Sequence, residues 1–171
     1  MALCALFIAL MAVGSFIRIP TPLTPLTLQA QIALLAGVLL GGLWGSLSVL
    51  LYVLLGLIGV PIFAGGGGVS YIFQPTFGYL LGFGVAAFVS GKIARRGMIT
   101  VGRIAFALTI GLVITYLIGL LYAVLVLTAY LHQVILWKEF LIGFVLITLP
   151  KDLVLTALSV PLLKRLMVYT R

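Results

Sequence analysis

Residues 31–60 contain no charged side chain, and this run restricts the possible folds of the chain more than any other feature. A helix rises about 1.5 Å per residue, so the run would extend about 45 Å, whereas about 20 residues cross a membrane. The sequence Gly-Gly-Leu-Trp-Gly-Ser at 41–46 favours a tight turn with Trp44 at a membrane interface. We therefore expect two short helices, at about 30–41 and 45–60.

The whole chain has the composition of an integral membrane protein. Of its 171 residues, 64% are hydrophobic and 7% are charged. Long apolar stretches of this kind are typical of transmembrane helices. We expect an all-α integral membrane protein, a single domain over residues 1–171 with six transmembrane helices. The four expected helices not yet named lie at about 1–17, 76–94, 104–130 and 140–165.

Two connections between these helices are irregular and, apart from Arg18, uncharged. Loop 1, residues 18–29, has three prolines within 20–25, which interrupt a helix. Its leucines alternate with threonines, so we expect an ordered loop that folds back against the helices. Loop 3, residues 61–75, contains four consecutive glycines and then aromatic residues. No Gly-Lys-Ser/Thr follows these glycines, which excludes a phosphate-binding loop of the nucleotide-binding type.

The basic residues are distributed unevenly between the two ends of the expected helices. Seven of the ten Lys and Arg residues lie between the fourth and fifth helices or after the sixth, and only Arg18 and Lys138 lie at the opposite end. The positive-inside rule then predicts a cell-membrane protein with both termini in the cytoplasm. Loops 1 and 3 and the connection 131–138 would face outward. This topology accounts for the net charge of +8 without a nucleic-acid partner.

Two charged residues, Lys151 and Asp152, lie in the middle of the last apolar segment. A charge at mid-bilayer costs about 2.5–3.5 kcal/mol on insertion scales, so such residues normally face the protein interior. The default interpretation is a functional site, and the alternative is an ion pair that locks this helix to a neighbour. Adjacent helical residues point about 100° apart, so the two need not serve the same partner. Pro150 is expected to kink the helix beside them.

Other classes of function find little support in the sequence. The chain has two acidic residues, one histidine and one cysteine, from which no catalytic nucleophile, base and orienting group can be assembled. We therefore expect no enzyme, no catalytic residue, no metal site and no cofactor. A purely structural membrane subunit remains an alternative, but it explains Asp152 only as a contact between helices.

Three segments resemble the BioY family, the biotin-specific substrate-binding (S) components of energy-coupling-factor (ECF) vitamin transporters. They are Pro-Leu-Thr-Pro-Leu-Thr-Leu-Gln at 22–29, the stretch 52–65 ending in Val-Pro-Ile-Phe-Ala-Gly, and Pro-Thr-Phe-Gly-Tyr-Leu-Leu-Gly-Phe at 75–83. The resemblance implies the six-helix S-component fold, with the ordered loop 1 covering an outward-facing pocket. It also implies high-affinity biotin capture and membrane translocation as one subunit of an ABC importer. The alternatives are another small vitamin or an intramembrane enzyme.

The resemblance further implies partners and ligand contacts. The partners are a transmembrane coupling protein, docked on the small-residue face of Ala5 and Ala9, and two ATPase subunits. Ionised Asp152 would accept a ureido N–H of biotin. The family commonly has a lysine three residues after this aspartate, whereas here Lys151 precedes it, and Lys151 either meets the valerate carboxylate or pairs with Asp152. The other ligand contacts expected are neutral residues: Thr27, Gln29, Phe73, Gln74, Tyr79 and Tyr116.

Overall fold

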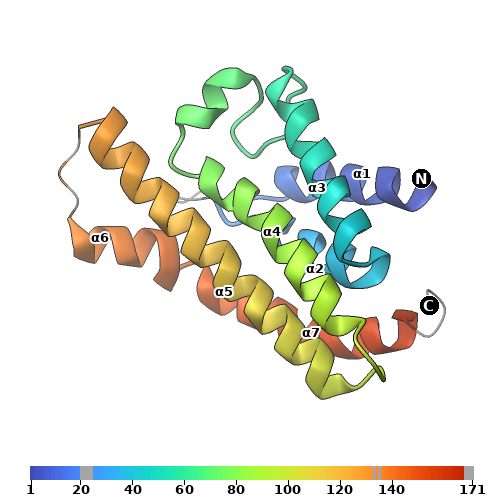
Figure 1. Ribbon diagram of the computed structural model, residues 1–171. Coiled ribbons are helices and arrows are strands. Elements are labelled where there is room, and N and C mark those ends of the chain that lie inside the picture. Colours follow the sequence, from blue (N-terminus) through green and yellow to red (C-terminus); the bar gives the residue numbers. More distant parts are fainter. Residues whose placement is uncertain (20–24, 133, 135, 168–171) are drawn as a thin grey trace.

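The computed structural model describes residues 1–19, 25–132, 134 and 136–167, and the regular elements within these ranges are helices (Figure 1). Pro20 and Pro22 of the expected proline break lie outside the described residues. In chain order the elements are α1 (Ala2–Phe16), α2 (Gln29–Leu40), α3 (Gly42–Leu57), the 3-10 helix η1 (Val69–Phe73), α4 (Phe77–Ala94), α5 (Val101–Leu125), the π-helical η2 (Val126–Tyr130), α6 (Trp137–Leu141), the π-helical η3 (Ile142–Leu146) and α7 (Leu149–Met167).

These elements confirm the all-helical fold, with α5 continued by η2 and the last expected helix divided into α6, η3 and α7. Within the described residues, three stretches are long and apolar enough to cross a membrane: Phe77–Ala94, Val101–Tyr130 and Ile142–Met167. The helices α1 to α3 are equally apolar but contain 15, 12 and 16 residues, fewer than the about 20 of an ordinary crossing.

The turn expected at 41–46 is present but tighter than expected. A single residue, Gly41, separates α2 from α3, and its φ of +90° lies in the region that glycine enters without a Cβ clash. Trp44 therefore belongs to the first turn of α3, where its side chain is exposed.

The last helix is interrupted rather than simply kinked. The π-helical η3 ends at Leu146, two residues form a turn, and α7 begins at Leu149, just before Pro150. Proline has no N–H and its ring collides with the carbonyl four residues earlier, so regular α-helical bonding cannot run through this point. The interruption lets Lys151 and Asp152 lie in the first turn of a new helix.

The centre of the molecule is α4, which lies between α5 on one side and α2 with α3 on the other (Figure 1). Glycines bring α2 and α4 into backbone contact: a Cβ built on Gly37 would lie 2.2 Å from the carbonyl oxygen of Ala87. One apolar cluster, including Tyr52 and Phe63, joins loop 3 to the helices beside it, and a second, including Leu108, lies among α2, α4, α5 and α7.

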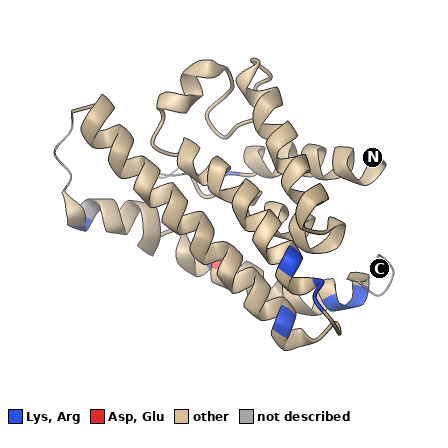
Figure 2. Ribbon diagram, in the orientation of Figure 1, with Lys and Arg blue, Asp and Glu red and all other residues tan. Residues whose placement is uncertain are grey.

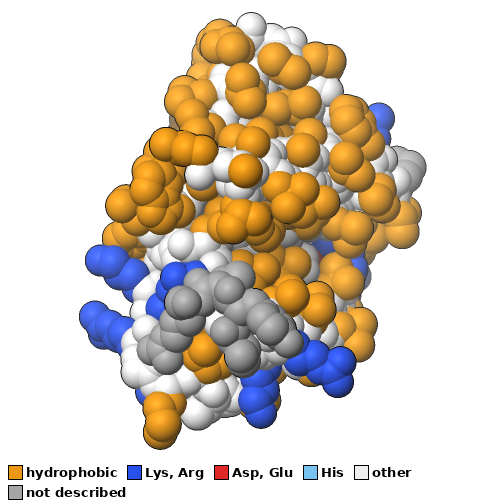
Figure 3. Space-filling view, turned by 90° about the vertical axis from the view of Figure 1, so that its right-hand side faces the viewer, with side chains coloured by type: hydrophobic (Ala, Val, Ile, Leu, Met, Phe, Trp, Pro, Cys, Tyr) orange, Lys and Arg blue, Asp and Glu red, His pale blue; other side chains and the backbone are white. Residues whose placement is uncertain are grey.

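Lys and Arg residues gather at one end of the molecule, near the connection between α4 and α5 and the end of α7 (Figure 2). The helix α1 begins and the helix α7 ends on this same side (Figure 1). Figure 3 shows this side in space-filling form, with Lys and Arg on its lower part and hydrophobic side chains over its upper part. The fold thus preserves the charge asymmetry that the sequence predicts.

Candidate functional site

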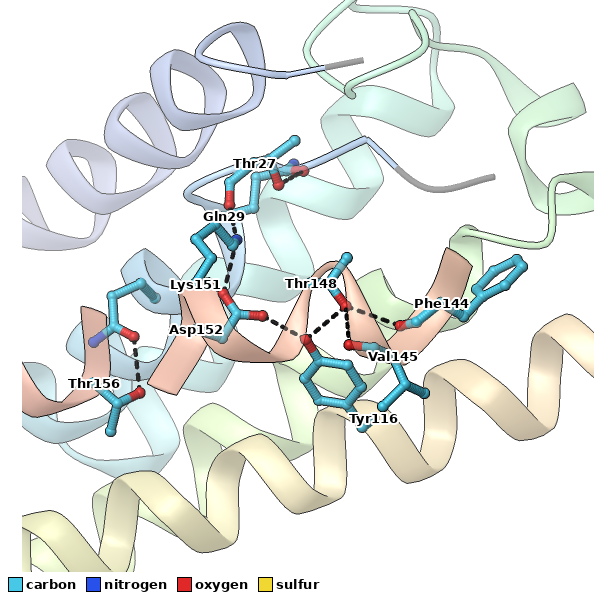
Figure 4. Close-up of polar contacts among 10 residues, drawn as sticks. Thr27, Gln29, Tyr116, Phe144, Val145, Thr148, Lys151, Asp152 and Thr156 are labelled. Carbon is cyan, nitrogen blue, oxygen red and sulfur yellow. Dashed lines mark hydrogen bonds and ion pairs between the residues drawn. The ribbon is translucent and has the colours of Figure 1, made fainter. Parts of the chain in front are cut away.

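Asp152 lies in the first turn of α7 and is only 4% exposed. Its Oδ2 accepts a hydrogen bond from the Tyr116 hydroxyl of α5, with 2.7 Å between the oxygens (Figure 4). Its Oδ1 lies 2.7 Å from the Lys151 ammonium. The carboxylate is therefore buried with a cation and a hydroxyl donor, the two kinds of partner that make a buried charge tolerable.

The hydroxyl of Thr148 orients the Tyr116 hydroxyl. Thr148 Oγ1 lies 2.8 Å from Tyr116 Oη and 2.9 Å from the carbonyl oxygen of Phe144. Tyr116 has one proton to donate, and the carboxylate of Asp152 is the stronger acceptor. Thr148, four residues before Asp152, thus supports the phenol that holds the carboxylate in place.

Lys151 connects α7 to loop 1. Its side chain is 26% exposed, and its ammonium contacts both Asp152 and the carbonyl oxygen of Thr27, to which it donates (Figure 4). Although adjacent helical residues start in different directions, the flexible lysine side chain curves back to its neighbour. One cation therefore joins the buried carboxylate to the backbone of the loop.

A cavity lies between loop 1, loop 3 and the helices α2, α4, α5 and α7, with about 580 Å³ of empty space when the open solvent at its mouth is included. The residues that line it are Pro25, Thr27, Gln29, Ala30, Ala64, Tyr71, Thr76, Tyr79, Leu80, Phe83, Thr115, Tyr116, Thr148, Lys151 and Asp152. An apolar cavity with a few convergent polar groups is the usual form of a small-molecule site. Six of the eight residues proposed from the sequence as ligand contacts meet here: Thr27, Gln29, Tyr79, Tyr116, Lys151 and Asp152.

Internal hydrogen bonds hold several of these side chains in fixed positions. The Gln29 amide donates to the Tyr52 hydroxyl at 2.6 Å and accepts from the Thr27 hydroxyl at 3.2 Å. Tyr52 in turn donates to the carbonyl oxygen of Ile62, 2.5 Å away, in loop 3. This chain of bonds joins loop 1, α3 and loop 3 along one side of the cavity.

Tyr79 contributes its aromatic ring to the cavity wall, because its hydroxyl is already bonded to the backbone. Its hydroxyl donates to the carbonyl oxygen of Phe144 at 3.1 Å. Its ring meets that of Tyr116 edge to face, with centroids 5.7 Å apart. The two tyrosines form an aromatic wall beside the carboxylate of Asp152.

The structure does not bring Phe73 and Gln74 into this cavity. Phe73 is 48% exposed and stacks on Tyr130, with ring centroids 4.5 Å apart. Gln74 lines an adjoining hollow, which shares Pro25 and Tyr71 with the cavity. Contact of these two residues with a ligand stays a prediction.

Sequence reasoning missed Thr115, Thr148, Tyr71 and Thr76 among the residues that line the cavity. The spacing of four residues between Thr148 and Asp152 was a usable signal, because such residues share a helix face. Tyr71 had no comparable signal, since it lies in a 3-10 turn that only the fold places under loop 1. Burial raises the pKa of the Tyr71 phenol, which keeps its hydroxyl neutral.

On α1, Ala5 and Ala9 are exposed and lie one turn apart. They form a thin strip on a helix that packs with its other side against α2 and α3. Across the described residues, no three His, Cys, Asp or Glu side chains lie together as metal ligands would.

Comparison with known proteins places this fold and site in context. The BioY family model matches residues 1–170. The probable biotin transporter BioY of Lysinibacillus sphaericus is 46% identical over 147 residues, which cover 85% of this chain and 75% of that protein. The biotin transporter BioY of Thermotoga maritima is 40% identical over 141 residues, which cover 82% and 79%.

A solved structure has the same fold. It is the S-component for biotin from an ECF-type ABC transporter, with a TM-score of 0.81 and 23% identity, and the match covers 99% of this chain and 94% of that one. The family match extends over almost the whole sequence, and close relatives align over most of it. The chain therefore belongs to the BioY family.

Proposed function

We propose that this chain is the biotin-specific S component of an ECF-type importer, a transport protein and not an enzyme. Its relatives are named as biotin transporters, and its fold is that of a biotin S component. The observation that carries the proposal is the buried carboxylate of Asp152 on the wall of an apolar cavity under loop 1. Asp152 Oδ1 lies 2.7 Å from the Lys151 ammonium and has no further hydrogen bond among the described residues, so its remaining lone pair can accept one from a ligand.

The chemistry of biotin fits the surfaces of this cavity. Its ureido ring carries two N–H donors and one carbonyl acceptor, its thiolane ring is apolar, and its valerate chain ends in a carboxylate. Asp152 Oδ1 accepts a ureido N–H in a charge-assisted hydrogen bond, which is stronger in a dry cavity than in water. Phe83, Leu80 and the rings of Tyr79 and Tyr116 surround the apolar part of the ligand.

In the proposed topology, residues 1–171 form one substrate-binding domain in the cell membrane with both termini in the cytoplasm. The start of α1 and the end of α7 lie on the side of the molecule where Lys and Arg gather, which supports this orientation by the positive-inside rule (Figure 2). Loops 1 and 3 then face outward over the cavity. The exposed strip of Ala5 and Ala9 on α1 docks on the coupling protein, which carries two ATPase subunits.

A binding titration of the purified protein in detergent tests this proposal. We expect saturable binding of biotin and no comparable binding of thiamine or riboflavin, in the absence of ATP and of any partner. Preferential binding of another vitamin would keep the S-component role but change the substrate. Failure of every vitamin to bind would overturn the proposal.

Asp152→Asn tests the site separately from the ligand. The variant keeps the shape of the side chain but removes the charge, so we expect biotin affinity to fall by at least about tenfold. An unchanged elution profile in size-exclusion chromatography shows that the variant is folded. Wild-type affinity in a folded Asp152→Asn protein would show that biotin binds elsewhere.

A further inference from the structure

Among the described residues, two buried side-chain oxygens have no hydrogen-bond partner: Asp152 Oδ1 and Thr115 Oγ1. Both residues line the same cavity. Asp152 Oδ1 is nevertheless in an ion pair with the Lys151 ammonium, 2.7 Å away, whereas the Thr115 hydroxyl has no such partner. Buried polar groups in folded proteins are normally paired, and an exception calls for an explanation such as a missing ligand.

Other threonines of the same continuous helix show what Thr115 lacks. A helical threonine commonly donates to the carbonyl oxygen four residues earlier. Thr109 does so to Ala105 at 3.0 Å, and Thr128 does so to Val124 at 2.8 Å, and both lie on the surface of the protein. Thr115 is 1% exposed and makes no such bond. The buried threonine is thus the one left unpaired.

Asp152 Oδ1 and Thr115 Oγ1 differ in the hydrogen bonds that they can make to a ligand. An ionised carboxylate only accepts hydrogen bonds, whereas a hydroxyl can donate one. A cyclic urea carries N–H donors next to a carbonyl acceptor, which matches an acceptor and a donor on one cavity wall. Thr115 and Tyr116 are consecutive on α5, and Tyr116 already contacts Asp152, so α5 brings the hydroxyl to the neighbourhood of the carboxylate.

We propose that Thr115 is a specificity-determining residue of this cavity, whose hydroxyl donates a hydrogen bond to the ureido oxygen of the ligand while Asp152 Oδ1 accepts a ureido N–H. This inference rests on the biotin binding proposed above and names the group that donates a hydrogen bond to the ureido carbonyl. In the complex, one ring of the ligand gives Thr115 Oγ1 its missing partner and gives Asp152 Oδ1 a second partner beside Lys151.

Thr115→Val tests the donor, because valine has nearly the same shape and no hydroxyl. We expect the affinity for biotin, measured by isothermal titration calorimetry in detergent, to fall by about tenfold or more. Thr115→Ser restores the hydroxyl and is expected to bind within about threefold of the unsubstituted protein. Thr109→Val is the matched control, since it removes a hydroxyl from an exposed site on the same helix, and it is expected to bind biotin normally.

A second ligand identifies the atom that Thr115 contacts. In the 2-thioxo analogue of biotin, sulfur, a weaker acceptor, replaces the ureido oxygen. We expect the unsubstituted protein to prefer biotin over this analogue, and Thr115→Val to lose most of that preference. Equal loss for both ligands would overturn the contact with the ureido oxygen, whatever the cause of the weaker binding.

The failure of this inference is distinguishable from failure of the proposed function. If Thr115→Val binds biotin as tightly as the unsubstituted protein while Asp152→Asn does not, the Thr115 contact is wrong and biotin binding stands. If the unsubstituted protein binds no biotin, both proposals fall.

Discussion

At the scale of single residues, Lys151 joins loop 1 to the buried carboxylate on the cavity wall. Its ammonium lies 2.7 Å from Asp152 Oδ1 and also donates to the backbone carbonyl of Thr27 in loop 1. The sequence left two roles open for Lys151, a contact with the ligand carboxylate or a pair with Asp152. The geometry of the structure favours the pair, with the loop carbonyl as a third member that the sequence did not indicate.

Lys151→Met separates these roles. Methionine has a similar length but no charge, so the substitution leaves Asp152 without its cation and loop 1 without its contact to α7. We expect the affinities for biotin and for its uncharged amide, biotinamide, to fall by the same factor, as measured by calorimetric titration. A variant whose affinity falls for biotin alone would show that the ammonium contacts the ligand carboxylate. Lys138→Met, at an exposed position on α6, is the control for loss of a charge.

At the scale of elements, backbone contacts fix how the helices that carry the site are arranged. Gly37 of α2 packs directly on α4. Arg95, which follows α4, donates to the carbonyl oxygens of Val38 and Leu39 in the last turn of α2. These carbonyls belong to the group that a helix end leaves without an internal partner. The arrangement of α2 against α4 is therefore set by both a close glycine contact and a cap from another helix.

Gly37→Ala is expected to disrupt this packing. Its new Cβ would meet backbone atoms of Ala87, the nearest at 2.2 Å, and backbone cannot rotate away as a side chain can. Overpacking of this kind costs about 1–3 kcal/mol, so the variant should unfold at a lower temperature in detergent. Gly102→Ala is the matched control, since a Cβ there has no neighbour within 4 Å, and alanine favours a helix. Equal unfolding temperatures for the two variants would contradict the close packing.

At the scale of the whole molecule, the cavity and the proposed docking surface are separate. The cavity lies among loop 1, loop 3, α2, α4, α5 and α7, whereas Ala5 and Ala9 are exposed on α1 and do not line it. Figure 1 shows α1 at the side of the molecule away from α5 and α6. Binding of the ligand and docking of the coupling protein should therefore respond to different substitutions.

The double variant Ala5→Leu, Ala9→Leu tests this separation. Leucine thickens the strip and prevents close approach of another helix. We expect biotin affinity to stay within about twofold, while most of the complex with the coupling protein and ATPases is lost in a co-purification experiment. Ala157→Leu makes the same enlargement at an exposed position on α7 and should leave the complex intact. Full assembly by the double variant would exclude this face as the docking surface.

The sequence by itself determined the features that follow from composition and order. Long apolar runs predicted the helices, the uneven Lys and Arg residues predicted an orientation, and an acid inside an apolar segment indicated the centre of the site. These features depend on how each segment partitions between lipid and water, which is a property of the segment alone. The break before Pro150 was only partly predictable, because proline forbids a regular helix without specifying how the chain continues.

Only the tertiary structure decided which neutral residues join Asp152. Helices that are apolar on every face carry no periodic signal for the side that faces a cavity, since lipid and protein interior are both apolar. Thr115 therefore looked like Thr109 in the sequence, and Phe73 looked as suitable as Tyr79. The packing of α5 against α4 and α7 buries Thr115 on the wall of the cavity that Asp152 also lines, and leaves Thr109 exposed. That difference is one of rotation about a helix axis, which is settled by contacts between helices.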